Sequence, residues 1–217
     1  MNKSILEQNR KAYDALAESY AQQWVNNPDL QLADQFLSML KKGAKILDVG
    51  CGPGHYSSYF IDQGFVVEAI DTSPAMLKLV KRRDSRIRSR LLDMSSLDYE
   101  DNEFDGLWVC ASLPHIPKEF VGEVLTGFRR VLSHDGCMLV NAIIGNIDHR
   151  IETAEEMGPG YEEPGRFFQW YPSINSFKII LEQAGFKVQA EQHRNVTSEV
   201  LEYATCRTNS WYNYFCI

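Results

Sequence analysis

Apolar and polar positions along the chain follow two different periods, and the changes between them predict an order of helices and strands. Near the start, apolar residues recur at helical spacing over residues 12–24 and 29–42. Further strands are predicted at residues 44–50, 65–71, 86–93, 104–112 and 136–145, and helices between them at 55–63, 74–80 and 120–132. This alternation indicates an α/β fold with a doubly wound, mostly parallel sheet.

The pattern changes after residue 150. A Gly- and Pro-rich stretch at residues 155–167 indicates a loop, and a helix is predicted over residues 173–185. Residues 186–193 and 209–217 can complete the sheet. Residues 195–209 are compatible with helix or strand.

The length and composition fit one domain. The chain has 217 residues, of which 44% are hydrophobic, enough for one core. We therefore expect a single domain over residues 1–217, with an N-terminal helical cap at residues 1–42 and a lid-like insertion at residues 146–172.

The net charge and the cysteines limit which binding partners and which cellular compartment we expect. The formal net charge of −7 argues against a general attraction to nucleic acid or an anionic membrane, and the basic run at residues 81–90 is divided between surface faces. The five cysteines are odd in number and widely spaced, which is typical of free thiols in a reducing compartment. The N-terminus lacks a signal-peptide core, and no apolar segment approaches the roughly 18 residues of a membrane span. We expect a cytoplasmic protein, monomeric or homodimeric, with no membrane partner and no metal.

The stretch "ILDVGCGPG", residues 46–54, is the strongest candidate site. Glycines are concentrated where backbone must turn tightly or approach a ligand. Their spacing here is G-x-G-x-G, and His55 stands where a dinucleotide fingerprint needs its third glycine. A nicotinamide cofactor and an NTPase phosphate loop are therefore both disfavoured.

Acidic residues end the strands that follow. Asp71 closes the second strand, where a carboxylate can accept hydrogen bonds from ribose hydroxyls, and Asp93 ends the third, where it can face an adenine amino group. Leu92, Met94 and Met76 supply apolar surfaces for the ring. This pattern indicates a nucleoside site with no phosphate clamp, which suits a positively charged adenosyl ligand.

Four stretches together, "ILDVGCGPG", "AIDTSPAML", "LLDMSSLDYEDNEFDGLWVCASLPHIP" and "FRRVLSHDGCMLV", resemble the class I S-adenosylmethionine-dependent methyltransferases of the small bacterial type. The resemblance covers about residues 10–190. It implies a seven-stranded Rossmann-like sheet whose last strand is antiparallel. Residues 133–136 ("SHDG") replace the family's usual Lys-Pro-Gly-Gly turn, and we expect this to affect only the turn.

The resemblance also implies roles for individual residues. Asp48 and the glycine backbone would surround the amino-acid end of the cofactor, Asp71 would hold the ribose and Asp93 the adenine. Cys110 and Ala111 would lie beside the sulfonium, and Tyr13 or Tyr20 would close over the ligand. The predicted contacts with S-adenosylmethionine, or with its product S-adenosylhomocysteine, are Tyr13, Tyr20, Asp48, Gly50, Cys51, Gly52, Gly54, Asp71, Thr72, Met76, Asp93, Met94, Cys110 and Ala111.

Two further features point to the methyl acceptor. His115 follows the fourth strand and is a candidate base, since a histidine titrates near neutral pH, although a structural role is equally open. Residues 165–172 ("GRFFQWYP") form either an aromatic lid, with Arg166 pairing with a substrate anion and Phe168, Trp170 and Tyr171 lining the acceptor site, or a buried strand.

We expect an enzyme that moves a methyl group to an oxygen, nitrogen or sulfur of a small molecule by in-line displacement. Two alternatives stay open. The acceptor could be tRNA or another RNA, or the chain could bind S-adenosylmethionine without catalysis.

Overall fold

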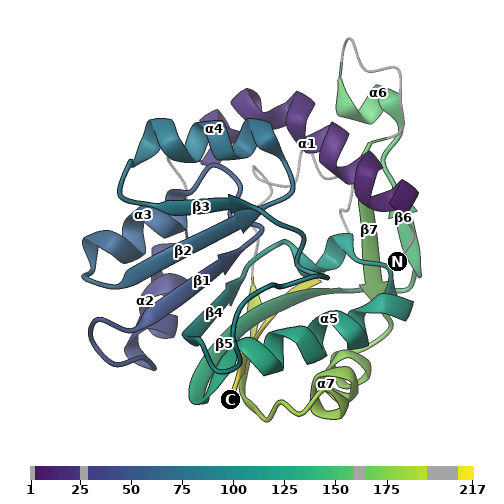
Figure 1. Ribbon diagram of the computed structural model, residues 1–217. Helices are drawn as coiled ribbons and strands as arrows, with labels where there is room; N and C mark the ends of the chain where they lie inside the picture. Colours follow the sequence, from purple (N-terminus) through teal and green to yellow (C-terminus); the bar gives the residue numbers. More distant parts are fainter. Residues whose placement is uncertain (1–2, 25–28, 159–164, 195–209) are drawn as a thin grey trace.

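A parallel five-stranded sheet forms the centre of the structure, a computed structural model that describes residues 3–24, 29–158, 165–194 and 210–217 (Figure 1). Its order is β3-β2-β1-β4-β5. The chain therefore adds strands toward one edge from β1 to β3 and toward the other edge from β4 on, and the order reverses between β1 and β4. The strands are β1 Lys45–Val49, β2 Val66–Asp71, β3 Arg88–Leu91, β4 Phe104–Val109 and β5 Leu132–Ile144. The predicted fold class is confirmed.

Helices cover both faces of this sheet because the strand side chains alternate between two apolar clusters. One cluster joins Leu47 and Leu107 to α5 (Lys118–Val131) and α7 (Ile174–Gln183). The other joins Ile46 and Trp108 to α2 and α3. The helices on that second face are α2 Leu30–Ser38, α3 His55–Asp62 and α4 Pro74–Arg83.

Two C-terminal strands extend the sheet beyond β5. Strand β9 (Ser210–Cys216) runs antiparallel to β5, and β8 (Val188–Arg194) pairs antiparallel with β9. These strands complete the seven-stranded arrangement expected from the family resemblance.

A short hairpin adds two further strands, which the sequence pattern did not predict as a pair. Strand β7 (Phe167–Tyr171) is parallel to the last two residues of β5, and β6 (His149–Ile151) is antiparallel to β7. Because β9 already occupies one edge of β5 at those residues, β7 lies on the opposite edge, beyond the end of β4. The helix α6 (Ala154–Met157) follows β6.

Helix α1 (Lys3–Trp24) crosses the end of the sheet from β7 to α4, as Figure 1 shows in purple. Its Ala17 and Ala21 pack on Met76 and Leu79 of α4. The small alanine side chains permit this close approach. No helix within the described ranges is long and apolar enough to span a bilayer.

Some boundaries differ from the sequence expectation. The helix expected over residues 29–42 ends at Ser38, and residues 133–136 form no turn, because α5 runs directly into β5 at Leu132. A bulge in the β4–β5 pairing between Phe104 and Gly106 accommodates that junction. Residues 195–209, left open between helix and strand, lie outside the described residues.

Candidate functional site

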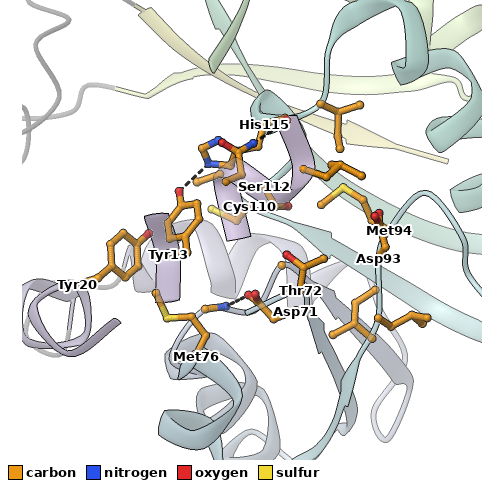
Figure 2. A pocket seen from close by; sticks show the side chains of 18 residues that line it. Tyr13, Tyr20, Asp71, Thr72, Met76, Asp93, Met94, Cys110, Ser112 and His115 are labelled. Carbon is orange, nitrogen blue, oxygen red and sulfur yellow. Dashed lines mark hydrogen bonds between the residues drawn. The ribbon is translucent and has the colours of Figure 1, made fainter. Parts of the chain in front are cut away.

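A cavity lies between α1 and the carboxyl ends of β1, β2 and β4 (Figure 2). This is the edge at which doubly wound sheets bind ligands, because the loops diverge where the winding reverses. Its lining comprises Leu6, Asn9, Tyr13, Tyr20, Gly50, Gly52, Ile70, Asp71, Thr72, Met76, Leu92, Asp93, Met94, Cys110, Ala111, Ser112, His115 and Ile116.

The glycine loop forms part of the cavity floor with bare backbone. Gly50 and Gly52 have φ values of 69° and 52°, in the left-handed region that favours glycine. A side chain at Gly50 would place its Cβ 2.5 Å from the Cβ of Ser112. Gly50 must therefore be glycine for two reasons, its backbone conformation and the lack of space.

Asp71 is fixed at the end of β2 by its own loop. Its Oδ2 accepts from the amide of Gly52 (2.9 Å) and its Oδ1 from the amide of Ser73 (2.8 Å). Burial raises the pKa of Asp71 to about 6, while those amides and that of Thr72 oppose the rise. Each oxygen keeps a second lone pair, so the carboxylate can still accept hydrogen bonds from a ligand.

Asp48 lies next to the cavity lining rather than within it. Its side chain is only 2% exposed and accepts a 2.5 Å hydrogen bond from Ser57 of α3. Burial raises the pKa of Asp48 to about 7, against the effect of the Ser57 bond. Asp48 thus connects β1, before the glycine loop, to α3, after it. Cys51 and Gly54 also lie outside the lining, and Gly54 caps α3 in a left-handed conformation.

The loop after β3 supplies a polar group beside apolar surface. Asp93 accepts from the amide of Ser95 (2.9 Å), a turn that holds its carboxylate at the cavity. Leu92 and Met94 line the cavity on either side, with Ile70 across from them in the lining of β2. This arrangement suits a flat heteroaromatic ring with a polar edge.

Backbone strain marks the turn after β4. Ala111 has a φ of 59°, uncommon for a residue with a side chain, and its amide donates to Asn141 Oδ1 (2.8 Å). The following residue, Ser112, is 6% exposed and lines the cavity, and its hydroxyl has no partner among the described residues. A buried hydroxyl without a partner is costly, so Ser112 is suited to bind a ligand.

Tyr13 and His115 form a hydrogen-bonded pair at the cavity. The Tyr13 hydroxyl lies 2.6 Å from His115 Nε2, and Nδ1 lies 2.7 Å from the carbonyl oxygen of Phe167 (Figure 2). Burial lowers the pKa of His115 to about 4, although the Phe167 bond opposes the change. The imidazole is therefore neutral at pH 7.

The aromatic segment at residues 165–172 is a buried strand rather than a lid lining the cavity. Trp170 and Tyr171 are buried outside the lining, and Tyr171 packs on Phe177 of α7. Phe168 also lies outside the lining and packs at a tilt against the His115 ring, with 4.7 Å between centroids and 53° between the ring planes. The expectation that these three side chains line the acceptor site is not what the structure shows for this cavity, because Trp170 and Tyr171 pair with β5, Phe168 pairs with Arg150 of β6, and all three lie outside the lining.

Arg166 forms an ion pair within the protein. Its Nε and one terminal nitrogen each lie 2.7 Å from a different carboxylate oxygen of Glu152. Its guanidinium carbon lies 5.6 Å from the centre of the Tyr13 ring. The expected pairing of Arg166 with a substrate anion is not what the structure shows, because Glu152 already neutralises the charge.

The cavity is therefore acidic and partly apolar. Among the described residues, its lining contains the carboxyl groups of Asp71 and Asp93 and no Lys or Arg. Such a lining favours a cationic or neutral ligand over a phosphate.

Most residues predicted for the cofactor meet in this cavity. The sequence interpretation missed Leu6, Asn9, Ile70, Ser112 and Ile116. Asn9 carried no motif signal, yet its side chain accepts from the amide of Phe167 (2.7 Å) and donates to the carbonyl of His115 (3.1 Å). It fixes α1 to both segments.

Comparison with known proteins supports a family assignment. The family described as "Methyltransferase domain" matches residues 46–136. Malonyl-[acyl-carrier protein] O-methyltransferase of Salmonella typhimurium is 33% identical over 104 residues, 46% of this chain and 41% of that protein. Demethylmenaquinone methyltransferase of Renibacterium salmoninarum is 36% identical over 85 residues, 38% of this chain and 36% of that protein. The chain thus matches about half or less of the length of its first curated relatives.

A solved structure extends the likeness to the whole fold. The 1,6-didemethyltoxoflavin-N1-methyltransferase of Burkholderia thailandensis, solved with 1,6-didemethyltoxoflavin and S-adenosylhomocysteine, has a TM-score of 0.71. It is 19% identical, and the match covers 99% of this chain and 87% of that one. At this identity the likeness shows the shared fold.

Proposed function

We propose that this chain is a class I S-adenosylmethionine-dependent methyltransferase that binds S-adenosylmethionine and methylates a small molecule, which its domain match and its relatives support. The observation that carries the proposal is the cavity itself. Bare glycine backbone lies beneath it, carboxylates follow two neighbouring strands, and its described lining holds no cation. Glycine backbone and carboxylates suit a sulfonium compound, whereas His55, at the position of the third glycine of a dinucleotide fingerprint, would obstruct the approach of a pyrophosphate to the start of α3.

The residues fit the adenosyl group. Asp71 would accept from the ribose hydroxyls, and Asp93, Leu92 and Met94 would hold the adenine. The amino-acid end would lie over Gly50 and Gly52, with the unpartnered hydroxyl of Ser112 within the same part of the lining. Bound there, the cofactor supplies a methyl group activated by its positively charged sulfur.

The protein's own contribution is position and exclusion of water. Tyr13 and Tyr20 of α1 line the cavity opposite the strand ends, and their rings pack edge to face with centroids 5.8 Å apart. Together with β7 behind His115, α1 would align the acceptor with the methyl group, which supplies most of the acceleration in a displacement of this kind. The described residues of the insertion, 146–158 and 165–172, would support α1 and η1 (Leu113–His115) at the edge of the cavity.

A small acceptor is favoured over RNA for two reasons. The formal net charge is −7, and the cavity lies behind α1 rather than on an open basic surface. We also propose a reducing, cytoplasmic location, because Cys51, Cys137 and Cys216 form no disulfide within the described part of the chain.

The proposal is tested by calorimetry with S-adenosylmethionine and S-adenosylhomocysteine on the purified chain. We expect both to bind, and we expect Asp71→Ala to weaken both. Absence of binding at millimolar concentration would refute the proposed function. An RNA complex that weakens steeply with salt would instead refute the choice of acceptor.

A further inference from the structure

Neither ring nitrogen of His115 is free for a ligand. A carbonyl oxygen only accepts hydrogen bonds, so the 2.7 Å contact with Phe167 requires that Nδ1 carry the proton. In the neutral imidazole, Nε2 then accepts, and the Tyr13 hydroxyl 2.6 Å away must donate to it. A molecule in the cavity can exchange a proton with His115 only through Tyr13.

The Tyr13 oxygen is suited to that exchange. It lines the cavity, it donates its proton to His115, and a phenol oxygen can accept a further hydrogen bond. Burial raises the pKa of Tyr13, partly offset by the charge of Arg166 and by a hydrogen bond from its guanidinium, which leaves one lone pair of the phenol oxygen for a ligand. Tyr13 is therefore protonated at neutral pH, and it can accept a proton only while giving up its own.

The charges around the cavity restrict the acceptor. The described lining has no Lys or Arg, and Arg166 behind Tyr13 is neutralised by Glu152. Leu6 and Ile116 add apolar surface beside the Tyr13–His115 pair. Apart from the sulfonium of the cofactor itself, an anionic acceptor would find no cation in the described lining, which favours a neutral acceptor.

Building on the proposed function, we propose that Tyr13 is a catalytic residue that takes the proton of a neutral acceptor with a weakly acidic O–H or N–H group, while passing its own proton to His115 Nε2. The acceptor's bond to hydrogen breaks, and the freed electron pair forms the bond to the methyl carbon as the carbon–sulfur pair stays on sulfur. One positive charge disappears at sulfur as one appears on the imidazole. The buried site therefore keeps its net charge, which favours protonation of His115 during transfer although the resting imidazole is a weak base.

The first test needs no acceptor. Long-range proton–nitrogen NMR of the labelled protein, with His115→Gln to assign the signals, reports the tautomer. We expect a neutral ring protonated at Nδ1 at pH 7, and Tyr13→Phe should move the Nε2 resonance toward that of an unbonded nitrogen. A proton on Nε2, or a doubly protonated ring at pH 7, would overturn the relay.

The second test uses S-adenosylmethionine with a series of phenols of graded acidity and a matched series of benzoates, measuring S-adenosylhomocysteine release. We expect the phenols to be methylated and the benzoates not. Tyr13→Phe and His115→Gln should each lower kcat by about 100-fold or more, and the double variant no further, since the two residues act as a unit. Affinity for S-adenosylhomocysteine should stay within about threefold if both act on the proton.

The ionisation state of the phenol separates a chemical role of the two residues from a structural one. A phenol already ionised at the assay pH needs no base, so both variants should lose less kcat with it than with a neutral phenol, although its charge should raise KM in wild type and variants alike. The groups that also act on this pair are Tyr20, Asp71, Glu152 and Arg166, and they are unchanged in these variants. Tyr99→Phe is the matched control, because it removes a comparable 2.5 Å hydroxyl bond, to Glu68, outside the cavity, and it should leave kcat unchanged.

The outcomes are distinguishable. Retained kcat in Tyr13→Phe, a preference for benzoates, or cofactor binding with no phenol methylated would each overturn the relay while leaving the proposed cofactor site standing. Failure of the wild type to bind S-adenosylhomocysteine would overturn the proposed function and the relay with it.

Discussion

Asp48 offers a direct test of how the glycine loop is stabilised. The carboxyl group is 2% exposed, and its described hydrogen bond is the one from Ser57. Burial raises the pKa of Asp48 to about 7, so folding above that pH requires a charged group in a poorly solvated place. Asp48→Asn keeps the shape and an acceptor oxygen for Ser57 but removes the charge at every pH.

The sign follows from proton binding. Between the unfolded pKa near 4 and the folded pKa of about 7, the folded state holds a proton that the unfolded state has lost. Stability from this group is therefore present at low pH and is lost as pH rises through 7. From pH 5 to pH 8.5 the loss spans two pKa units, which is about 3 kcal/mol at roughly 1.4 kcal/mol per unit.

We therefore expect the difference in unfolding free energy between Asp48→Asn and wild type to rise in favour of the variant by about 3 kcal/mol from pH 5 to pH 8.5. Urea unfolding followed by circular dichroism measures it at both pH values. Asp101→Asn removes an exposed carboxylate and should change stability by no more than about 0.5 kcal/mol at either pH. A difference for Asp48→Asn that is the same at both pH values would refute the reasoning.

Three further variants test other parts of the site. Asp71→Asn should raise the Kd for S-adenosylhomocysteine about 10- to 100-fold by calorimetry at pH 8, the range for losing charge-assisted hydrogen bonds. Because burial raises the pKa of Asp71 to about 6, wild-type affinity should fall below pH 6 and that of the variant should not. Glu152→Gln leaves Arg166 buried without its partner and should lower unfolding free energy by about 3–5 kcal/mol in urea, with Arg166→Gln in the same chain restoring part of the loss. Gly50→Ala should lower Tm and abolish binding of S-adenosylhomocysteine, since its Cβ would lie 2.5 Å from that of Ser112.

Local signals were sufficient for the parallel half of the fold. The start of the helix predicted over residues 74–80 is an example: Ser73 is its N-cap, with its hydroxyl accepting from the amide of Met76, and Pro74 stands at the first helical position. The strand ends at Val49 and Asp71 were also predictable, because the apolar runs stop where the chain turns toward the cavity. In each case the cause lies within a few residues of the effect.

Residues 165–172 show where local pattern is insufficient. The run Phe167–Tyr171 has the composition of a strand and of an aromatic lid alike. The choice is made by Ile143 and Ile144, which extend beyond the end of β4 and leave an edge for β7 to pair with. That edge is free because β5 extends further than β4. The sequence of residues 165–172 contains no information about this difference in strand length.

The acceptor side of the cavity depends on polar contacts between segments far apart in the sequence. Asn9 bonds to His115 and Phe167, 106 and 158 residues away, and Phe167 in turn accepts from His115. The Asn9 side chain belongs to no sequence motif. Its hydrogen bonds nevertheless hold three parts in fixed relative positions: Phe167, whose carbonyl determines the His115 tautomer, His115 itself, and the helix that carries Tyr13. Proton handling at this site is therefore a property of the junction between α1, η1 and β7, because the described contact that requires the proton of His115 on Nδ1 is the one with the Phe167 carbonyl.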